Sequence, residues 1–424
     1  MTTENHILVS TKDSNVSDGI SGVLNSGPLV GRKILIIVEN LPVPFDRRVW
    51  QEAKTLRRAG AEVSVICPTG KGHTSKYENI DGINVYRHQL PIDANGALGY
   101  ALEYSAALYW EVWLAFRVLR KHGFDVIHAC NPPDLIFLVA LLFKPFGKKF
   151  LFDHHDINPE LYEAKFGKRD FFYKVMLWAE KATFWLADVS IATNNSYRQL
   201  AIQRGGMHPE DVFVVRSGPD LSKLVNTSPN ARWKNGREYL IGYVGVMGQQ
   251  EGIDLLLQSI EYIVRDLGRS DVQFCLVGGG PSLADLILQC DRMGLSDFVT
   301  FTGRISDHDL FEVLSTADVC VNPDRVNAMN DKSTMNKVLE YMAFGKAQVQ
   351  FEVTEGRYSA ADSSLYAKAN DVRDFAEKIL ELLADPEEAK RMGEVGRRRV
   401  DTMFSWDHQV PALVAAYQRV FSKS

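Results

Sequence analysis

The chain has 424 residues, of which 46% are hydrophobic and 24% are charged. Because a single hydrophobic core rarely grows beyond about 250–300 residues, this length favours two domains. The ordinary composition excludes a wholly disordered protein. The formal net charge of -5 excludes a strongly basic nucleic-acid-binding protein, so we expect no nucleic acid partner.

The five cysteines are scattered and show no paired spacing. We therefore expect a reduced, cytoplasmic protein with neither a disulfide framework nor a zinc site. Residues 1–30 are polar and lack the basic start and apolar core of a secretory signal, so we expect a flexible tail. No apolar run free of charges reaches the ~18–20 residues that a membrane span needs.

From residue 31 to residue 216, short Val/Ile-rich segments alternate with longer amphipathic segments. The predicted strands are 33–39, 61–67, 125–130, 148–153, 188–193 and 211–216. The predicted helices are 46–60, 97–122, 134–146, 170–186 and 194–204. This alternation is typical of α/β domains in which helices join parallel strands, and it predicts a Rossmann-like, doubly wound sheet.

The alternation starts again after residues 217–236, which are rich in Ser, Asn, Pro and Gly and are predicted to be a linker. Strands are predicted at 239–245, 272–278, 298–303, 318–323 and 347–352, and helices at 252–266, 282–293, 307–315 and 334–344. We therefore predict one Rossmann-like domain over 31–216 and a second over 217–402. A last helix within 403–424 is predicted to pack back on the first domain.

Ligands of open α/β sheets bind at the carboxyl ends of the strands, so we expect the site in a cleft between the two domains. The first candidates follow the strand 148–153, in the sequence DHHDINPELY. Histidine can hold a hydroxyl or transfer a proton near neutral pH, which predicts catalytic roles for His155 and Asp156 and an acceptor-side position for His154. A metal on Asp153 and His155 lacks a third nearby ligand, and a helix-capping loop is the structural alternative.

Two segments of the second half, 243–254 and 277–282, contain glycines between a predicted strand and a predicted helix. Glycine lets the backbone approach a phosphate closely, and a helix N-terminus favours anions. Gly248 is therefore a candidate for contact with the phosphates of a ligand. A plain tight turn is the structural alternative for both loops.

The segment 322–350, NPDRVNAMNDKSTMNKVLEYMAFGKAQVQ, is the most informative. Ser333 or Thr334 is predicted to cap a helix whose polar side chains share one face. Such a helix start suits a diphosphate, and a carboxylate one turn later can accept hydrogen bonds from two ribose hydroxyls. A surface pair between Lys337 and Glu340 is the alternative. The predicted donor-binding residues here are Asp331, Lys332, Ser333, Thr334, Asn336, Lys337 and Glu340.

The loop after the first predicted strand holds Pro44, Asp46 and Arg47, which we place on the acceptor side. Arg47 or Arg48 could contact a negatively charged acceptor. Solvated charge at the start of a helix is the alternative.

Two segments, 98–123 and 135–150, combine apolar or aromatic residues with basic ones. This composition suits a membrane interface, and it equally suits a core helix of an α/β domain. The net charge is +3 over residues 31–215, -2 over 1–30 and -6 over the remainder. A basic first domain could therefore contact anionic lipid while the acidic second domain stays in solution.

Together, these motifs resemble the retaining glycosyltransferases of family 4, also described as glycosyl transferases group 1. The resemblance covers nearly the whole chain after residue 31. It is carried by ENLPVPFDRRVWQEAKTLRRAG, HDINPELY, ATNNSY, VVRSGPD, GGGP, FTGRIS and KVLEYMAFGKAQV. It implies the two-domain GT-B fold and the transfer of a sugar from a UDP- or GDP-sugar to an acceptor hydroxyl. It also implies that neither a metal nor another cofactor is needed.

The resemblance also assigns roles to single residues. Glu340 matches the glutamate that binds the nucleotide ribose, and His155 matches the histidine near the reacting sugar. Gly303 and Arg304 lie where the family holds the nucleobase, chiefly through backbone.

This sequence departs from the family pattern at two places. Lys332 stands where the family has an acidic residue. The loop that normally carries an Arg and a Lys for the diphosphate reads VMGQQEG instead, at 246–252. The nearest cations that could replace this pair are Lys332, Lys337 and Arg325.

We therefore expect a glycosyltransferase on the inner face of the plasma membrane, bound peripherally, that builds a lipid-linked or exopolysaccharide glycan of the cell surface. A catalytically altered subunit that only binds nucleotide sugars is the alternative suggested by the missing cations. A nucleotide-sugar epimerase of the same architecture is a further alternative.

Overall fold

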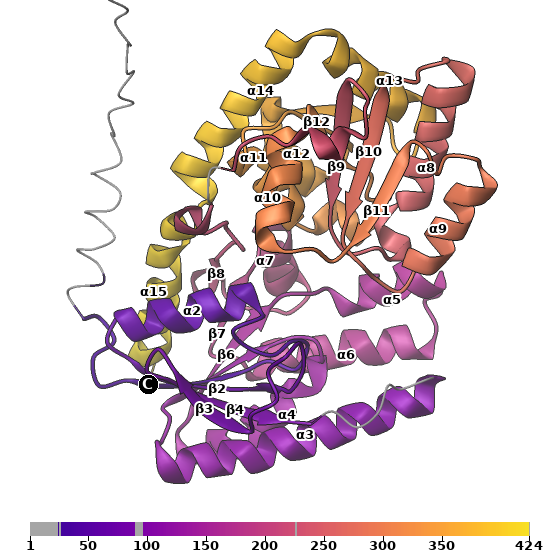
Figure 1. Ribbon diagram of the computed structural model, residues 1–424. Helices are drawn as coiled ribbons and strands as arrows, with labels where there is room; N and C mark the ends of the chain where they lie inside the picture. The colour runs from indigo at the N-terminus through magenta and orange to yellow at the C-terminus, as the bar shows by residue number, and fades with distance from the viewer. Residues whose placement is uncertain (1–23, 25–26, 90–95, 225–226, 424) are drawn as a thin grey trace, which may run out of the picture. The chain divides into compact units, whose positions relative to one another are not determined.

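The computed structural model describes residues 24, 27–89, 96–224 and 227–423, and the side chains of 96–105 are not considered (Figure 1). Residues 1–23 and 25–26 of the predicted tail lie outside the described residues. Contacts divide the chain into two compact units. The first unit comprises the chain up to Asp153, Leu186–Ile191 and Asp407–Ser424, and the second comprises His154–Trp185 and Ala192–Trp406. The ranges 31–216, 217–402 and 403–424 stay predictions of the folding domains.

The first sheet has eight strands in the order β3-β4-β2-β1-β5-β6-β7-β8. Its strands are β1 Lys33–Ile37, β2 Glu62–Pro68, β3 Tyr77–Ile80, β4 Ile83–His88, β5 Val126–Cys130, β6 Lys149–His154, β7 Val189–Ala192 and β8 Val212–Val214. The strand β1 pairs in parallel with β2 and β5, and β5 pairs in parallel with β6. The hairpin β3–β4 is antiparallel.

Helices connect these strands, as the alternating pattern predicts. They are α2 Arg47–Arg58, α3 Gly96–Lys121, α4 Phe137–Phe143, α5 Asn158–Phe166, α6 Phe171–Leu186, α7 Asn195–Gln203 and α15 Trp406–Ser422. In Figure 1, α2 lies on one side of the sheet, and α3 and α4 lie on the other. Side chains cap two of the helices, because Asp46 accepts from the Val49 N–H and Asn194 from the Tyr197 N–H.

The second sheet has six strands in the order β11-β10-β9-β12-β13-β14, and their register is parallel. The strands are β9 Tyr239–Val244, β10 Val272–Val277, β11 Val299–Gly303, β12 Val319–Asn322, β13 Gln348–Phe351 and β14 Ser364–Ala367. The helices are α8 Ile253–Glu261, α9 Leu283–Arg292, α10 Asp307–Thr316, α11 Asn336–Ala343, α12 Thr354–Ala360, α13 Val372–Ala384 and α14 Pro386–Arg399. The whole sheet lies in the second unit.

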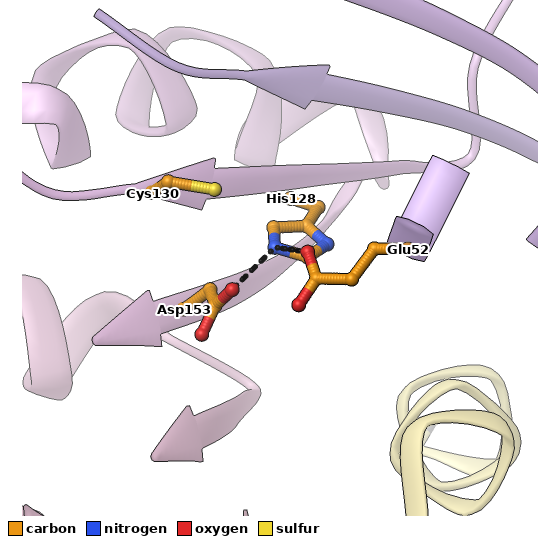
Figure 2. Close-up of side chains that lie close together, drawn as sticks. All are labelled: Glu52, His128, Cys130 and Asp153. Carbon is orange, nitrogen blue, oxygen red and sulfur yellow. Dashed lines mark hydrogen bonds and ion pairs between the residues drawn. The ribbon is translucent and has the colours of Figure 1, made fainter. Parts of the chain in front are cut away.

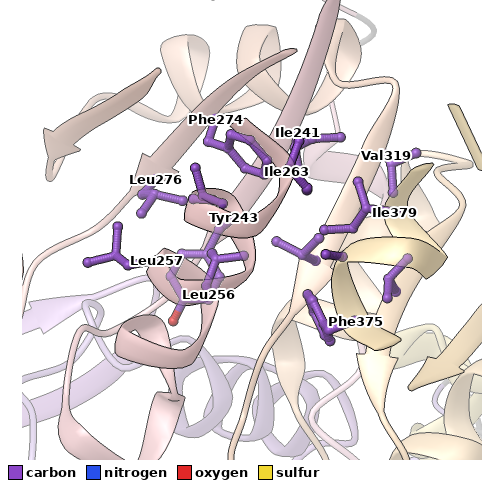
Figure 3. Packing of buried hydrophobic residues seen from close by; sticks show 14 of the residues in the cluster. Ile241, Tyr243, Leu256, Leu257, Ile263, Phe274, Leu276, Val319, Phe375 and Ile379 are labelled. Atoms are coloured by element: carbon purple, nitrogen blue, oxygen red, sulfur yellow. The ribbon is translucent and has the colours of Figure 1, made fainter. Parts of the chain in front are cut away.

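The core of the second unit forms where helices cover this sheet. Ile241, Phe274 and Val319 project from neighbouring strands and pack against helical residues such as Leu256 and Phe375 (Figure 3). Strand β10 is buried along its whole length, which is why its sequence is apolar apart from Gln273 rather than alternating. The carboxyl ends of these strands are thereby held at one edge.

The predicted α/β architecture is confirmed, because each predicted strand is present with ends within two residues of the prediction. The prediction missed β3 and β4, which a turn at Asp81 and Gly82 joins, both with positive φ. It also missed α5, which begins inside the predicted polar loop, and the elements between 354 and 399. None of the described helices is long and apolar enough to cross a membrane.

Candidate functional site

Three loops of the second unit meet at the carboxyl ends of its sheet: 245–252 after β9, 278–282 after β10 and 323–335 after β12. The first two loops pack backbone to backbone, since the Met247 N–H donates to the Gly279 carbonyl and the Ser282 N–H to the Met247 carbonyl. A Cβ on Gly278 would lie 1.9 Å from the Gly245 oxygen, and one on Gly280 would lie 2.5 Å from the Met247 oxygen. These two glycines therefore serve the tight packing of the loops, which is the structural alternative stated above.

A pocket of about 440 Å³ opens beside these loops and includes residues from all three. Gly248 and Ser282 line it, and Arg325 contributes a guanidinium. Arg325 forms an ion pair with Asp254 and also borders a neighbouring pocket of about 390 Å³. The predicted ligand-binding position of Gly248 therefore lies on a real cavity.

The three cations predicted to replace the missing pair have different environments. The Lys337 ammonium lies 2.6 Å from Asp324 and over the Tyr243 ring, and its side chain is 10% exposed. Burial would lower the pKa of Lys337, but Asp324 and the nearby Tyr243 outweigh it, so this pKa is raised. Lys332 donates to the Ala328 carbonyl. Of the three, Arg325 is the one that lines the pocket.

Ser333 and Thr334 do not cap the following helix, so this prediction is wrong. Helix α11 begins at Asn336, and its N-cap residue is Met335. The Ser333 hydroxyl instead lies 3.0 Å from the Tyr197 hydroxyl, and the Thr334 hydroxyl accepts from Asn194 at 3.1 Å. Two residues of the ATNNSY motif therefore hold the loop that precedes α11.

Asp331 accepts hydrogen bonds from the Thr354 N–H and hydroxyl, both at 2.8 Å, at the start of α12. This contact gives Asp331 a structural task beside its predicted role in donor binding. On α11, Asn336 is exposed and Glu340 is half-buried, while Val338, Leu339 and Tyr341 are buried. The polar face of α11 is therefore its accessible face.

At the end of β11, Gly303 has a φ of 64° and open space around the position of a Cβ, and Arg304 is exposed. The loop that the family uses for the nucleobase is thus accessible in this chain.

The predicted catalytic loop follows β6 directly. His155 and Asp156 are half-buried, and Asp156 lies near Tyr197, where burial and this carboxylate raise the pKa of the phenol. His154 is fully buried, and its ring lies against Glu180, Phe184 and Tyr197. This burial contradicts the prediction that His154 contacts an acceptor, because a side chain that alternates to the interior face of a strand cannot reach the surface.

The sequence analysis gave no role to Arg216, which belongs to the VVRSGPD motif and is buried in the structure. Its guanidinium donates to Thr334 at 3.2 Å and pairs with Glu355 at 3.4 Å, and Glu355 accepts from the N–H and hydroxyl of Ser196. The motif that contains Arg216 was visible in the sequence, but nothing pointed to Glu355 as its partner.

In the first unit, Asp46 caps α2, Arg47 is exposed and Pro44 is half-buried. Arg48 is buried, which removes it as an alternative to Arg47 for contact with an acceptor. The Arg48 guanidinium makes two hydrogen bonds to the Asp153 carboxylate, at 2.9 and 3.2 Å, and lies 3.2 Å from Glu52.

Asp153 belongs to a buried group with Glu52, His128 and Cys130, which together could hold a metal ion (Figure 2). The sequence offered Asp153 and His155 as possible metal ligands but no third ligand nearby. In the structure, the other possible ligands beside Asp153 come from other elements, and His155 is not part of the group. The imidazole of His128 lies 3.4 Å from Asp153 and 2.7 Å from the Tyr417 hydroxyl of α15. Arg48 already supplies a positive charge to this group.

Burial shifts the pKa values of two side chains in this group. Burial and the nearby Asp153 raise the pKa of Glu52 well above its ordinary value. Burial also raises the pKa of the Cys130 thiol, so this cysteine is a neutral core residue rather than a reactive thiolate. The guanidinium of Arg48 thus lies between the carboxyl groups of Asp153 and Glu52, and burial favours the protonated form of Glu52.

Comparison with known proteins adds independent information. The profile "Glycosyltransferase Family 4" matches residues 46–223, and "Glycosyl transferases group 1" matches residues 238–385. O-antigen chain mannosyltransferase C of Escherichia coli is 29% identical over 304 residues, which are 70% of this chain and 76% of that protein. Alpha-maltose-1-phosphate synthase of Mycolicibacterium smegmatis is 25% identical over 270 residues, which are 58% of this chain and 67% of that protein.

Solved structures are similar over nearly the whole chain. Sucrose-phosphate synthase from Thermosynechococcus elongatus superposes with a TM-score of 0.74 at 22% identity, covering 93% of this chain and 100% of that one. WaaG, a glycosyltransferase involved in lipopolysaccharide biosynthesis, gives a TM-score of 0.66 at 16% identity and covers 90% of this chain and 98% of that one. At these identities the similarity establishes the fold alone.

The raised pKa of Glu52 makes stability depend on pH. A glutamate protonated in the folded state and ionised when unfolded loses its stabilising contribution as pH rises above about 4.3. We expect Glu52→Gln to raise the melting temperature relative to the unaltered chain, by an amount that grows as the pH rises above about 4.3 towards the raised pKa of Glu52 in the folded state. The difference in the free energy of unfolding between Glu52→Gln and the unaltered chain should grow by up to about 1.4 kcal/mol per pH unit. The exposed Glu62→Gln is the control, and a flat difference for Glu52→Gln would contradict the assignment.

Proposed function

Because the chain belongs to the glycosyltransferases of family 4, group 1, and shares their GT-B fold, we propose that it is a retaining, metal-independent enzyme that uses a nucleotide diphosphate sugar. The pocket at the carboxyl ends of the second sheet carries this proposal. It joins three loops that the family uses for the donor, and a guanidinium lines it. The resemblance found in the sequence is confirmed at the level of the family.

We place the donor diphosphate against Arg325. The guanidinium has five N–H donors, so its ion pair with Asp254 leaves donors for a phosphate. Lys337 is held by Asp324, and the loop 246–252 has no Arg or Lys. Arg325 therefore replaces the missing pair, and the N-terminus of α11 adds the partial positive charge that favours a leaving diphosphate.

The nucleoside half of the donor is assigned to Glu340, Gly303 and Arg304. Glu340 lies on the accessible face of α11, where its carboxylate can accept from two ribose hydroxyls. The open space around Gly303 leaves room for a base beside the backbone. His155 and Asp156 are assigned to the reacting sugar, because both are half-buried rather than enclosed.

The acceptor is assigned to the loop of Pro44, Asp46 and Arg47 in the first unit. We propose a lipid-linked or polysaccharide acceptor of cell-surface glycan synthesis. A relative of this chain is named an O-antigen chain mannosyltransferase, which supports this class of acceptor.

A surface of the first unit supports attachment to membranes from the cytoplasmic side. Tyr109, Trp110, Trp113 and Phe116 of α3 are exposed and fall on one face of the helix. Helix α4 contacts α3 and exposes Leu138, Leu141 and Leu142. Basic residues lie near the C-terminus of α3, at Arg117, Arg120 and Lys121, and follow α4 at Lys144, Lys148 and Lys149. Aromatic side chains beside cations suit the interface of an anionic bilayer.

Donor use is tested by measuring nucleotide release from UDP-, GDP- and ADP-sugars in the presence of a membrane lipid extract. We expect release with one donor.

Glu340→Gln should raise KM for that donor about 10–100-fold, because it weakens charge-assisted hydrogen bonds to the ribose. His155→Ala should lower kcat by at least about 100-fold. The exposed Glu352→Gln is the control, and a folded protein that is silent with every donor would contradict the proposal.

The role of Arg325 is tested in the same assay. Arg325→Gln removes the cation that we assign to the diphosphate, so KM for the donor should rise at least about tenfold while the fold is retained. Arg373→Gln, on the exposed side of α13, is the matched control. An unchanged KM would exclude Arg325 from the donor site.

Membrane attachment is tested by sedimentation with phosphatidylcholine vesicles, with and without phosphatidylglycerol. We expect binding that requires the anionic lipid and weakens with salt. The double variant Trp110→Ser/Trp113→Ser should bind about tenfold more weakly, because it removes the aromatic anchors. Leu288→Ser on α9, equally exposed in the second unit, should bind normally, and equal binding by both variants would contradict this surface.

A further inference from the structure

Helix α6 exposes an apolar face that has no task in the proposed transfer (Figure 1). Apart from its last residue, the helix belongs to the second unit. Its inner side is buried, and there Glu180 forms an ion pair with Arg204. Its outer side carries large apolar residues, of which Phe171 is 72% exposed and Trp185 is 80% exposed. The inner side therefore anchors α6 to the fold, and the outer side is accessible.

The exposed apolar residues of α6 form one line along the helix. Their spacings of three, four and seven residues bring them to the same face. Each of them is at least 39% exposed, and they are Phe171, Val175, Trp178 and Trp185. We call these four side chains the α6 stripe. Single exposed apolar residues are common in soluble proteins, whereas a continuous apolar surface that includes three aromatic rings marks an interaction site.

The charges beside the α6 stripe are positive. Lys174 and Lys181 lie seven residues apart on one flank of the stripe, and both are exposed. The single carboxylate in the sequence of α6 is Glu180, which is buried. The turn 167–170 before the helix adds two cations and one carboxylate. The accessible face of α6 is therefore both apolar and cationic, which suits an anionic partner.

A second copy of this chain is disfavoured as that partner. Two stripes facing each other would bring the lysines of both copies to one interface, and α6 has no exposed carboxylate to offset them. A partner helix or peptide is disfavoured as well, because such segments bind in grooves. Side chains as exposed as Phe171 and Trp185 project from the surface rather than line a groove. These observations favour a broad anionic surface that the side chains can enter.

We propose that the α6 stripe binds an anionic lipid bilayer, with α6 lying parallel to the membrane surface. The rings of Phe171, Trp178 and Trp185 enter the region between headgroups and acyl chains, which is where aromatic side chains gather in membrane proteins. Lys174 and Lys181 remain at the level of the lipid phosphates. The helix has 16 residues and is about 24 Å long, so it lies along the interface rather than crossing the bilayer.

This surface is separate from the one proposed above on α3 and α4, which belong to the first unit. The inference depends neither on the sugar transfer nor on lipid contact by α3 and α4. It does add to the proposed function, because α5 alone separates α6 from the loop of His155 and Asp156. A lipid-bound α6 would thus join the proposed site of the reacting sugar to the membrane that holds a lipid-linked acceptor.

The decisive measurement is the depth of α6 in the bilayer. All five native cysteines are buried, so a nitroxide can be attached selectively after Val175→Cys in the full chain. On vesicles of phosphatidylcholine and phosphatidylglycerol, we expect this nitroxide to be accessible to oxygen and protected from a water-soluble nickel complex. A nitroxide attached after Lys390→Cys, at an exposed position of α14, is the control and should stay accessible to nickel. Equal accessibility of the two labels on bound protein, or no binding of the chain to these vesicles, would overturn the proposal.

The same label separates α6 from the surface on α3 and α4. In the Trp110→Ser/Trp113→Ser background, at a lipid concentration that binds this variant, the nitroxide at position 175 should still be protected from nickel. Loss of that protection would show that α6 does not enter the bilayer.

The aromatic rings are tested by Phe171→Ser/Trp185→Ser. Because both side chains lie on the surface, the melting temperature should be retained, while binding to the anionic vesicles should weaken about tenfold. Ile287→Ser/Leu288→Ser, at exposed positions of α9, is the matched control and should bind normally. Equal binding by both double variants would contradict a role of the α6 stripe. Sedimentation velocity without lipid covers the alternative partner, since a dimer that dissociates in Phe171→Ser/Trp185→Ser would assign the stripe to a second copy and overturn the proposal.

The lysines provide a second variant that removes no apolar contact. Lys174→Gln/Lys181→Gln should weaken binding to vesicles that contain phosphatidylglycerol and reduce its dependence on salt. This variant carries the test if Phe171→Ser/Trp185→Ser fails to fold. An unchanged affinity and salt dependence would exclude the proposed contact with lipid phosphates.

Discussion

The ion pair between Arg48 and Asp153 is the contact around which the functional loops of this chain are arranged. Arg48 is the second residue of α2 and follows Asp46 and Arg47, and Asp153 is the penultimate residue of β6, two positions before His155. Because both partners are buried, removing either would leave an uncompensated charge, which typically costs about 3–5 kcal/mol. The same pair therefore joins the start of α2 to the end of β6, beside the loops that we propose for the acceptor and for the reacting sugar.

Two neighbouring arginines thus have separate tasks. The helical turn that places Arg48 inside the first unit leaves Arg47 exposed. The second unit has a related arrangement, in which Arg216 is buried with Glu355 and donates to Thr334, while Arg325 borders the pocket. In both places a buried arginine pairs with a carboxylate, and a second arginine is at least partly exposed.

The sequence was sufficient for the α/β architecture, because continuous apolar strands and amphipathic helices differ in period and length. The missed hairpin β3–β4 carried a usable signal, since Asp81-Gly82 between apolar strands is typical of a two-residue turn. The capping prediction for Ser333 and Thr334 failed because their partners, Tyr197 and Asn194, lie more than a hundred residues away. Local spacing cannot reveal such contacts.

The same limit applies to the buried charges. The buried side chains of Glu39, His88 and Glu111 lie close to one another but come from three parts of the first unit, and no spacing in the sequence relates them. The net charge says equally little about buried charges, because the +3 of residues 31–215 is a sum over exposed and buried side chains alike. Around Asp153 the chain supplies a positive charge in Arg48, while burial and the neighbouring Glu39 raise the pKa of Glu111.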